Sequence, residues 1–104
     1  MYRILRTATA DAGISRIILY INEKFGAETA LRKLEELESD INRLAEDPYI
    51  GTDPKFMVLQ RQGYKVLITE KDLVFYKIFD EEETVIIYAV TDQRQDYLDI
   101  LRGM

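Results

Sequence analysis

The stretch GYKVLITEKDLVFYKIFDEEETVIIYAV, residues 63–90, contains runs rich in β-branched and aromatic residues, and short polar turns separate them. Residues of these types favour strands, and short turns join antiparallel neighbours. We expect strands over Met57–Thr69, with a bend at Gly63, over Leu73–Phe79 and over Thr84–Thr91. The segment therefore predicts an antiparallel meander.

Two amphipathic helices are predicted before this segment. Apolar residues recur at helical spacing over Ala8–Phe25, where Thr7 or Thr9 can cap the start and Gly26 can end the helix. The apolar stripe of the second helix consists of Ala30, Leu34, Leu37, Ile41 and Leu44. Because the single residue Gly26 joins the two helices, we expect an antiparallel hairpin.

The remaining segments complete one domain over residues 1–104. We expect a short strand over Tyr2–Arg6, a surface connection over Asp47–Pro54 and a closing helix over Gln93–Leu101. The predicted fold class is α+β, in the order β-α-α-β-β-β with a short C-terminal helix. The helical hairpin would cover one face of a small, mainly antiparallel sheet and leave the opposite face open.

The composition excludes several kinds of chemistry. The chain has 104 residues, no cysteine and no histidine, so it offers no disulfide, no thiolate and no imidazole base or ligand. We expect no metal and no cofactor. The longest apolar runs, Ile17–Ile21 and Val85–Val90, are too short to span a bilayer, and the N-terminus resembles no signal peptide. We therefore expect a cytoplasmic protein without a membrane partner.

Charge is unevenly distributed along the chain. The net charge is −5 overall, which argues against a dedicated nucleic-acid ligand. Residues 28–47 carry −4 and residues 80–99 carry −6, whereas residues 55–77 carry +3. This pattern predicts a basic sheet between an acidic helix and an acidic tail. The basic strand residues fit edge protection as well as phosphate binding.

Several runs, in this order, resemble the RelE/ParE superfamily of bacterial toxins. They are Ile17–Ile21 in the first helix, Gly63–Ile68, Leu73–Ile78, Thr84–Val90 and the ending Arg94–Leu101. The likeness covers nearly the whole chain. It implies the toxin of a type II toxin–antitoxin pair, held inactive by a cognate protein antitoxin.

The resemblance leaves the target open. RelE-like members cleave messenger RNA on the ribosome without a metal, whereas ParE-like members bind and poison DNA gyrase. The matches at Gly63–Lys65 and Arg94–Tyr97 favour the ribosome-dependent endoribonuclease. Gyrase inhibition is the close alternative. A third possibility is a weakly active antitoxin-binding partner that serves plasmid stabilisation, and the oligomeric state stays open.

RNA cleavage without a metal needs a base for the ribose 2′-hydroxyl, cations for the phosphorane charge and an acid for the leaving oxygen. The resemblance implies Lys65 and Arg94 for phosphate charge and Tyr97 for base stacking or proton transfer. These three are the expected catalytic residues. Arg61 and Tyr64 are expected to bind RNA.

Overall fold

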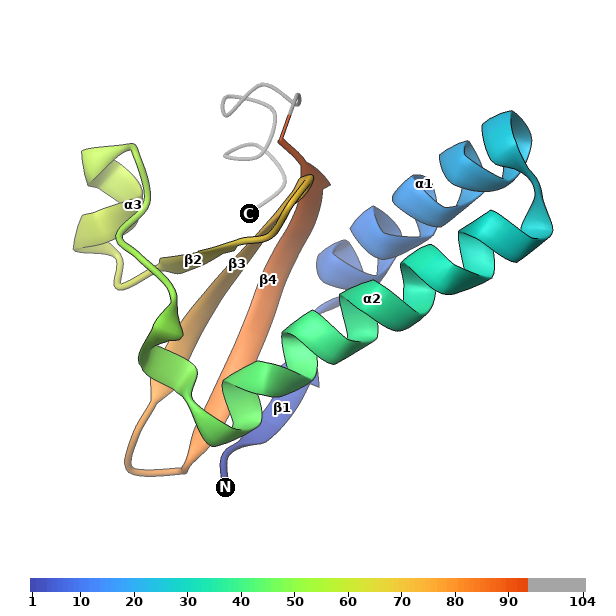
Figure 1. The fold of residues 1–104 in the computed structure, drawn as a ribbon. Helices are drawn as coiled ribbons and strands as arrows, with labels where there is room; N and C mark the ends of the chain where they lie inside the picture. The colour runs from blue at the N-terminus through green and yellow to red at the C-terminus, as the bar shows by residue number, and fades with distance from the viewer. Residues whose placement is uncertain (94–104) are drawn as a thin grey trace.

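The computed structural model describes residues 1–93, so the closing helix expected over Gln93–Leu101 lies, apart from its first residue, outside the described residues. The described chain forms a sheet, a helical hairpin and short helical turns (Figure 1). The elements are β1 (Arg3–Arg6), α1 (Ala8–Phe25), α2 (Ala27–Glu46), the 3-10 turn η1 (Pro48–Ile50), α3 (Met57–Arg61), β2 (Lys65–Ile68), β3 (Asp72–Phe79) and β4 (Thr84–Asp92).

The described sheet has four strands in the order β1-β4-β3-β2. β2, β3 and β4 pair antiparallel through tight turns, which confirms the predicted meander. β1 pairs parallel with the central strand β4. A parallel pair needs a long crossover, and the helical hairpin supplies it, since α1 and α2 lie on one face of the sheet (Figure 1).

The hairpin begins and turns at the predicted residues. The Thr7 hydroxyl accepts a hydrogen bond from the Ala10 N–H at 3.1 Å and so caps α1. Gly26 ends α1 with φ at +94°, a backbone conformation that favours glycine, and its N–H donates to the Asn22 carbonyl at 3.0 Å. The predicted bounds of the first helix and the antiparallel hairpin are thereby confirmed.

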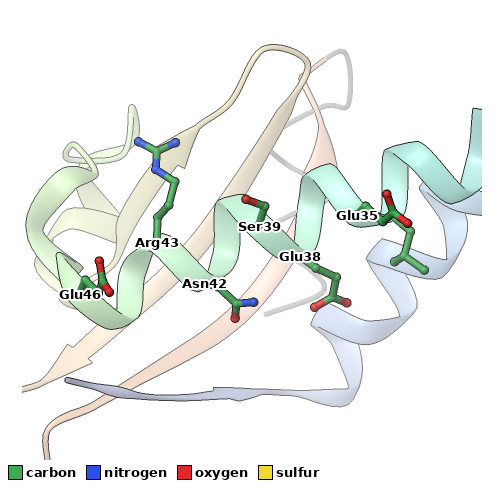
Figure 2. A pocket seen from close by; sticks show the side chains of 7 residues that line it. Glu35, Glu38, Ser39, Asn42, Arg43 and Glu46 are labelled. Atoms are coloured by element: carbon green, nitrogen blue, oxygen red, sulfur yellow. The ribbon is translucent and has the colours of Figure 1, made fainter.

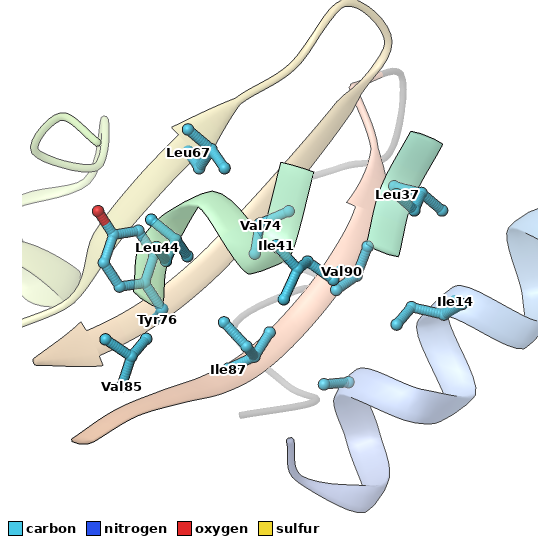
Figure 3. Close-up of a cluster of buried hydrophobic side chains, with 11 residues drawn as sticks. Ile14, Leu37, Ile41, Leu44, Leu67, Val74, Tyr76, Val85, Ile87 and Val90 are labelled. Carbon is cyan, nitrogen blue, oxygen red and sulfur yellow. The ribbon is translucent and has the colours of Figure 1, made fainter. Parts of the chain in front are cut away.

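The main core lies between α2 and the sheet (Figure 3). Leu37, Ile41 and Leu44 of α2 pack toward Val74 of β3 and Ile87 of β4, and each is at most 1% exposed. α1 approaches β4 even more closely, because a Cβ atom added at Gly13 would lie 2.0 Å from the Val90 carbonyl oxygen. Glycine is therefore required at the crossing of α1 and β4.

The structure corrects the strand expected over Met57–Thr69. Its first residues form the helix α3, and β2 covers only Lys65–Ile68. A short apolar run does not distinguish a helix from a strand, and Met57, Leu59 and Arg61 are good helix formers. The bend expected at Gly63 is the end of this helix, since φ is +89° there.

The face of the sheet opposite the hairpin is not fully open, which corrects a second expectation. Leu59 of α3 packs there with Tyr64, Val66, Leu73, Phe75 and Ala89, all buried. β3 is apolar on both faces, and a strand of this kind needs cover on each side. α3 and Tyr64 supply part of that cover.

The connection over Asp47–Pro54 is more firmly attached than a plain surface loop. Thr52 pairs with Val66 on the outer edge of β2. The buried Tyr76 hydroxyl donates to the Pro48 carbonyl at 2.7 Å and accepts from the Gly51 N–H at 3.1 Å. These bonds connect η1 with the middle of the sheet.

Candidate functional site

Lys65 lies at the start of β2, directly opposite Tyr76 of β3. Directly paired residues of neighbouring strands share a face, and Tyr76 belongs to the core beneath the hairpin. The Lys65 ammonium group contacts the Asp53 carboxylate at 3.1 Å, with both side chains partly exposed. The cation expected to meet a phosphate is therefore already paired within the chain.

Tyr64 points to the other face of the sheet, so the structure separates it from Lys65. Tyr64 is 6% exposed, and its ring contacts the Tyr88 ring edge to face, with the ring centres 5.3 Å apart. The ammonium group of Lys77 lies 4.4 Å from the centre of the Tyr64 ring and 5.3 Å from that of Tyr88. These three side chains form what we call the Lys77 cluster.

A β-bulge brings Tyr88 into the Lys77 cluster. Phe75 pairs with Ala89 and Tyr76 pairs with Ile87, so Tyr88 is an extra residue in β4. The Thr7 hydroxyl donates to the Tyr88 carbonyl at 3.2 Å and connects the bulge with the start of α1. Strand alternation indicates that Lys77 shares a face with Leu73 and Phe75, but no local pattern predicts the bulge.

The Lys77 cluster presents a cation beside two aromatic rings. Among the described residues no carboxylate pairs with Lys77, and the described ion pairs involve other cations. Burial raises the pKa of Tyr64, so its phenol is neutral at physiological pH and cannot act as a base. The cluster can attract an anion through the Lys77 ammonium group.

The other predicted site residues do not join this cluster. Arg61 is exposed at the end of α3. Arg94 and Tyr97 lie outside the described residues. The predicted basic sheet is also corrected, because only Lys65 and Lys77 of the basic residues at 55–77 lie on strands, and they lie on opposite faces. Turns and α3 carry the other cations.

The concave surface described on α2 is acidic. A groove of about 630 Å³ is lined by Leu34, Glu35, Glu38, Ser39, Asn42, Arg43 and Glu46. Figure 2 shows Glu38 and Asn42 directed toward β1, with Arg43 and Ser39 on the other side of the helix. None of the predicted site residues lines this groove. Its three glutamates outnumber its one arginine, so the groove would repel a phosphate.

The fold is similar to that of chains in solved toxin–antitoxin systems. The ParDE system of Pseudomonas aeruginosa matches with a TM-score of 0.73 at 16% identity, over 88% of this chain and 96% of that one. The RelBE2 toxin–antitoxin complex of Mycobacterium tuberculosis matches with a TM-score of 0.66 at 19% identity, over 88% and 98%.

Sequence comparison then identifies the family. The model of the ParE toxin of the type II toxin–antitoxin system parDE matches residues 4–97. Toxin ParE1 of Caulobacter vibrioides is 31% identical over 77 residues, which are 74% of this chain and 75% of that protein. The chain belongs to the ParE toxin family of type II toxin–antitoxin systems.

Among the described residues, none of the helices combines the length and the apolar character that crossing a membrane requires.

Proposed function

We propose that this toxin stops growth by binding DNA gyrase and that a cognate protein antitoxin neutralises it. The observation that carries the proposal is the ParE family match over residues 4–97, because ParE-like members of the superfamily act on gyrase. Three further features support a target other than the ribosome. They are the overall charge of −5, the pairing of Lys65 with Asp53 and the separation of Lys65 from Tyr64.

Inhibition by binding requires no general acid or base, whereas cleavage of RNA requires both. Cleavage needs a base and an acid on either side of one phosphate. Of the three expected catalytic residues, Lys65 is the one within residues 1–93, and it is engaged by the Asp53 carboxylate. A protein inhibitor needs a complementary surface and an exclusion of water from a few central contacts.

The decisive experiment is a supercoiling assay with purified gyrase and the purified toxin. We expect inhibition without ribosomes, and relief of that inhibition by stoichiometric antitoxin. In cells, induction of the toxin alone would arrest growth and cause DNA damage while messages stay intact. Unimpaired supercoiling at micromolar toxin, together with growth arrest, would refute gyrase as the target.

The antitoxin part of the proposal is tested separately. We expect a small reading frame for the antitoxin next to the toxin gene, and a stable complex when the two are co-expressed. If the toxin arrests growth to the same extent with and without co-expression of the neighbouring product, that product is not its antitoxin. A toxin that leaves growth unaffected when expressed alone would instead support the weakly active partner of a plasmid-stabilisation module.

Cleavage of ribosome-bound messenger RNA is the second candidate, and the Lys77 cluster favours it. The Lys77 ammonium group is a suitable contact for a nucleotide phosphate, and the half-buried Tyr88 ring beside it is a suitable contact for the base. Here Lys65 and Arg94 would meet the phosphate charge, and Tyr97 would stack on a base or transfer a proton. Arg61 and Tyr64 would hold the RNA.

Mapping of messenger RNA 5′ ends on translating ribosomes tests this second candidate. Codon-phased cuts that disappear in Arg94→Ala and Lys77→Met, but persist in Lys24→Met, would establish cleavage. Lys24 is a matched control because it is an exposed lysine in the last turn of α1. An absence of cuts during growth arrest would exclude cleavage.

A further inference from the structure

Strand register places a row of side chains across the face of the sheet opposite the hairpin. Leu5 of β1 pairs with Ile86 of β4, and Ile86 pairs with Lys77 of β3. Directly paired residues of neighbouring strands share a face. The contact of the Lys77 ammonium group with the Tyr64 ring shows which face this is, because Tyr64 packs with α3 on the side opposite the hairpin.

A second row of side chains runs beside the first. Arg3 of β1 pairs with Thr84 of β4, and Thr84 pairs with Phe79 of β3. Each of these residues lies two positions along its strand from a residue of the first row, so the two rows share one face. Together they form what we call the outer patch, which consists of Arg3, Leu5, Lys77, Phe79, Thr84 and Ile86.

In the described part of the chain, the outer patch has less cover than the rest of this face. α3 lies beside β2, at the other edge of the sheet from β1 (Figure 1), and its Leu59 packs with Phe75. Leu5, Phe79 and Ile86 belong to neither of the described hydrophobic cores, and Leu5 is 43% exposed. Apolar side chains that gather on an uncovered face are typical of a surface that binds a partner.

The outer patch carries two cations and no acidic residue. The Arg3 guanidinium donates to the Thr84 hydroxyl at 3.5 Å, and the Lys77 ammonium group lies over the Tyr64 and Tyr88 rings. Among the described residues, the ion pairs involve neither cation. Both charges can therefore meet carboxylates of a partner, although the chain as a whole carries −5.

We propose that the outer patch binds DNA gyrase, through a gyrase surface on which carboxylates flank apolar side chains. The two cations lie at diagonally opposite corners of the patch, and Ile86 lies between them on β4. An apolar centre with charges at the rim is typical of a protein interface. RNA fits less well, because Leu5 and Ile86 offer neither a charge for its phosphates nor a ring for its bases. The inference rests on the proposed function, since gyrase is the partner.

The test measures inhibition of supercoiling by purified gyrase with the variant Arg3→Glu/Leu5→Gln of the full chain. Its matched control is Arg16→Glu/Leu19→Gln, which makes the same two changes at exposed positions of α1, on the other side of the sheet. We expect the toxin concentration for half inhibition to rise at least about tenfold in the patch variant, while the control inhibits like the wild type. Circular dichroism confirms that both variants fold.

A second variant, Lys77→Met, removes the other cation and keeps a straight apolar side chain beside the Tyr64 and Tyr88 rings. We expect the concentration for half inhibition to rise about fivefold, because a charged contact with gyrase is lost. This variant decides the proposal if Arg3→Glu/Leu5→Gln does not fold.

The outcomes separate this proposal from the proposed function. If the wild type inhibits gyrase and the folded patch variants inhibit equally well, the outer patch is not the gyrase surface, and the proposed function stands. If the wild type does not inhibit gyrase, both fail. The proposal is also overturned if the patch variants keep inhibition but lose the antitoxin complex, RNA binding or self-association, because the patch then serves that other partner.

Discussion

At the scale of single residues, Gly13 sets the distance between α1 and β4. A methyl group at this position would lie 2.0 Å from the Val90 carbonyl oxygen, so the helix must move outward. Alanine improves helix propensity by about 1 kcal/mol, but such overpacking costs about 3 kcal/mol. We therefore expect Gly13→Ala to lower the melting temperature by roughly 10 °C. Differential scanning calorimetry measures it.

The control for that substitution is Ser15→Ala, at an exposed position of the same helix. It gains similar helix propensity without a clash, so its melting temperature should be unchanged or slightly higher. A Gly13→Ala protein as stable as the wild type would show that α1 moves away from β4 at no cost.

Asp80 connects three segments that lie far apart in the sequence. The Tyr2 hydroxyl donates to one carboxylate oxygen at 2.6 Å, and the Tyr49 hydroxyl donates to the other. These bonds lower the pKa of Asp80, and the bond to Asp80 raises the pKa of Tyr2 to about 12. The carboxylate and both neutral phenols are thus the stabilising forms.

These shifts predict how stability depends on pH. An unfolded aspartate titrates near pH 4, so the contribution of Asp80 is present above that value and is lost as the pH falls through the lower folded pKa. An unfolded tyrosine titrates near pH 10, so the contribution of Tyr2 is present below that value and is lost as the pH rises toward about 12.

The measurement compares the wild type with the Tyr2→Phe/Tyr49→Phe variant. We expect the difference in melting temperature to be constant between about pH 5 and 9 and to shrink on both sides. A difference that stays constant down to pH 3 would mean that the tyrosines stabilise the fold by packing instead.

At the scale of elements, the ion pair between α2 and the turn before β3 predicts a large cost for removing one partner. Lys33→Met leaves the Asp72 carboxylate buried without its cation, which typically costs about 3 to 5 kcal/mol. Arg43→Met breaks an exposed pair on the same helix and should cost less than about 0.5 kcal/mol. Urea unfolding of both variants tests the contrast. Equal urea midpoints for the two variants would show that the loss of the Lys33 charge does not destabilise the fold.

The short helix α3 lies where the sequence predicts the start of a strand. Met57–Arg61 is too short for a clear period, and Leu59 is its one buried residue, so the pattern fits a helix and a strand equally. Gly63 then ends α3 and allows Tyr64 to turn back onto the sheet. Tyr64 and Lys65 lie on opposite faces because successive residues of an extended chain alternate between the two faces.

At the scale of the whole molecule, the net charge of −5 opposes binding to a polyanion. Lys65 of β2 and Lys77 of β3 lie on opposite faces of the sheet, so these two cations do not combine into one phosphate-binding strip. We expect the toxin to bind isolated RNA more weakly than about 100 μM at physiological salt, as filter binding would measure. Micromolar binding of RNA with a steep salt dependence would contradict this expectation and would support the ribosome as the target.

The sequence by itself determined the helical hairpin, its turn at Gly26 and the three-strand meander, and it left Thr7 and Thr9 open as the cap that the structure assigns to Thr7. These features follow from local periodicity and from the backbone preferences of single residues. The resemblance to RelE/ParE toxins also followed from the sequence and is confirmed by the family match. The roles of Arg61, Tyr64, Lys65, Arg94 and Tyr97 stay predictions.

Only the tertiary structure decided which side chains meet. Lys33 and Asp72 are 39 positions apart, and no local sequence pattern around either residue predicts their ion pair. The bulge at Tyr88 and the reversal at Gly63 likewise bring Tyr88 and Tyr64 to Lys77. The physical reason is that strand register and helix docking depend on packing over the whole core, whereas sequence periodicity reports only the face on which each residue lies.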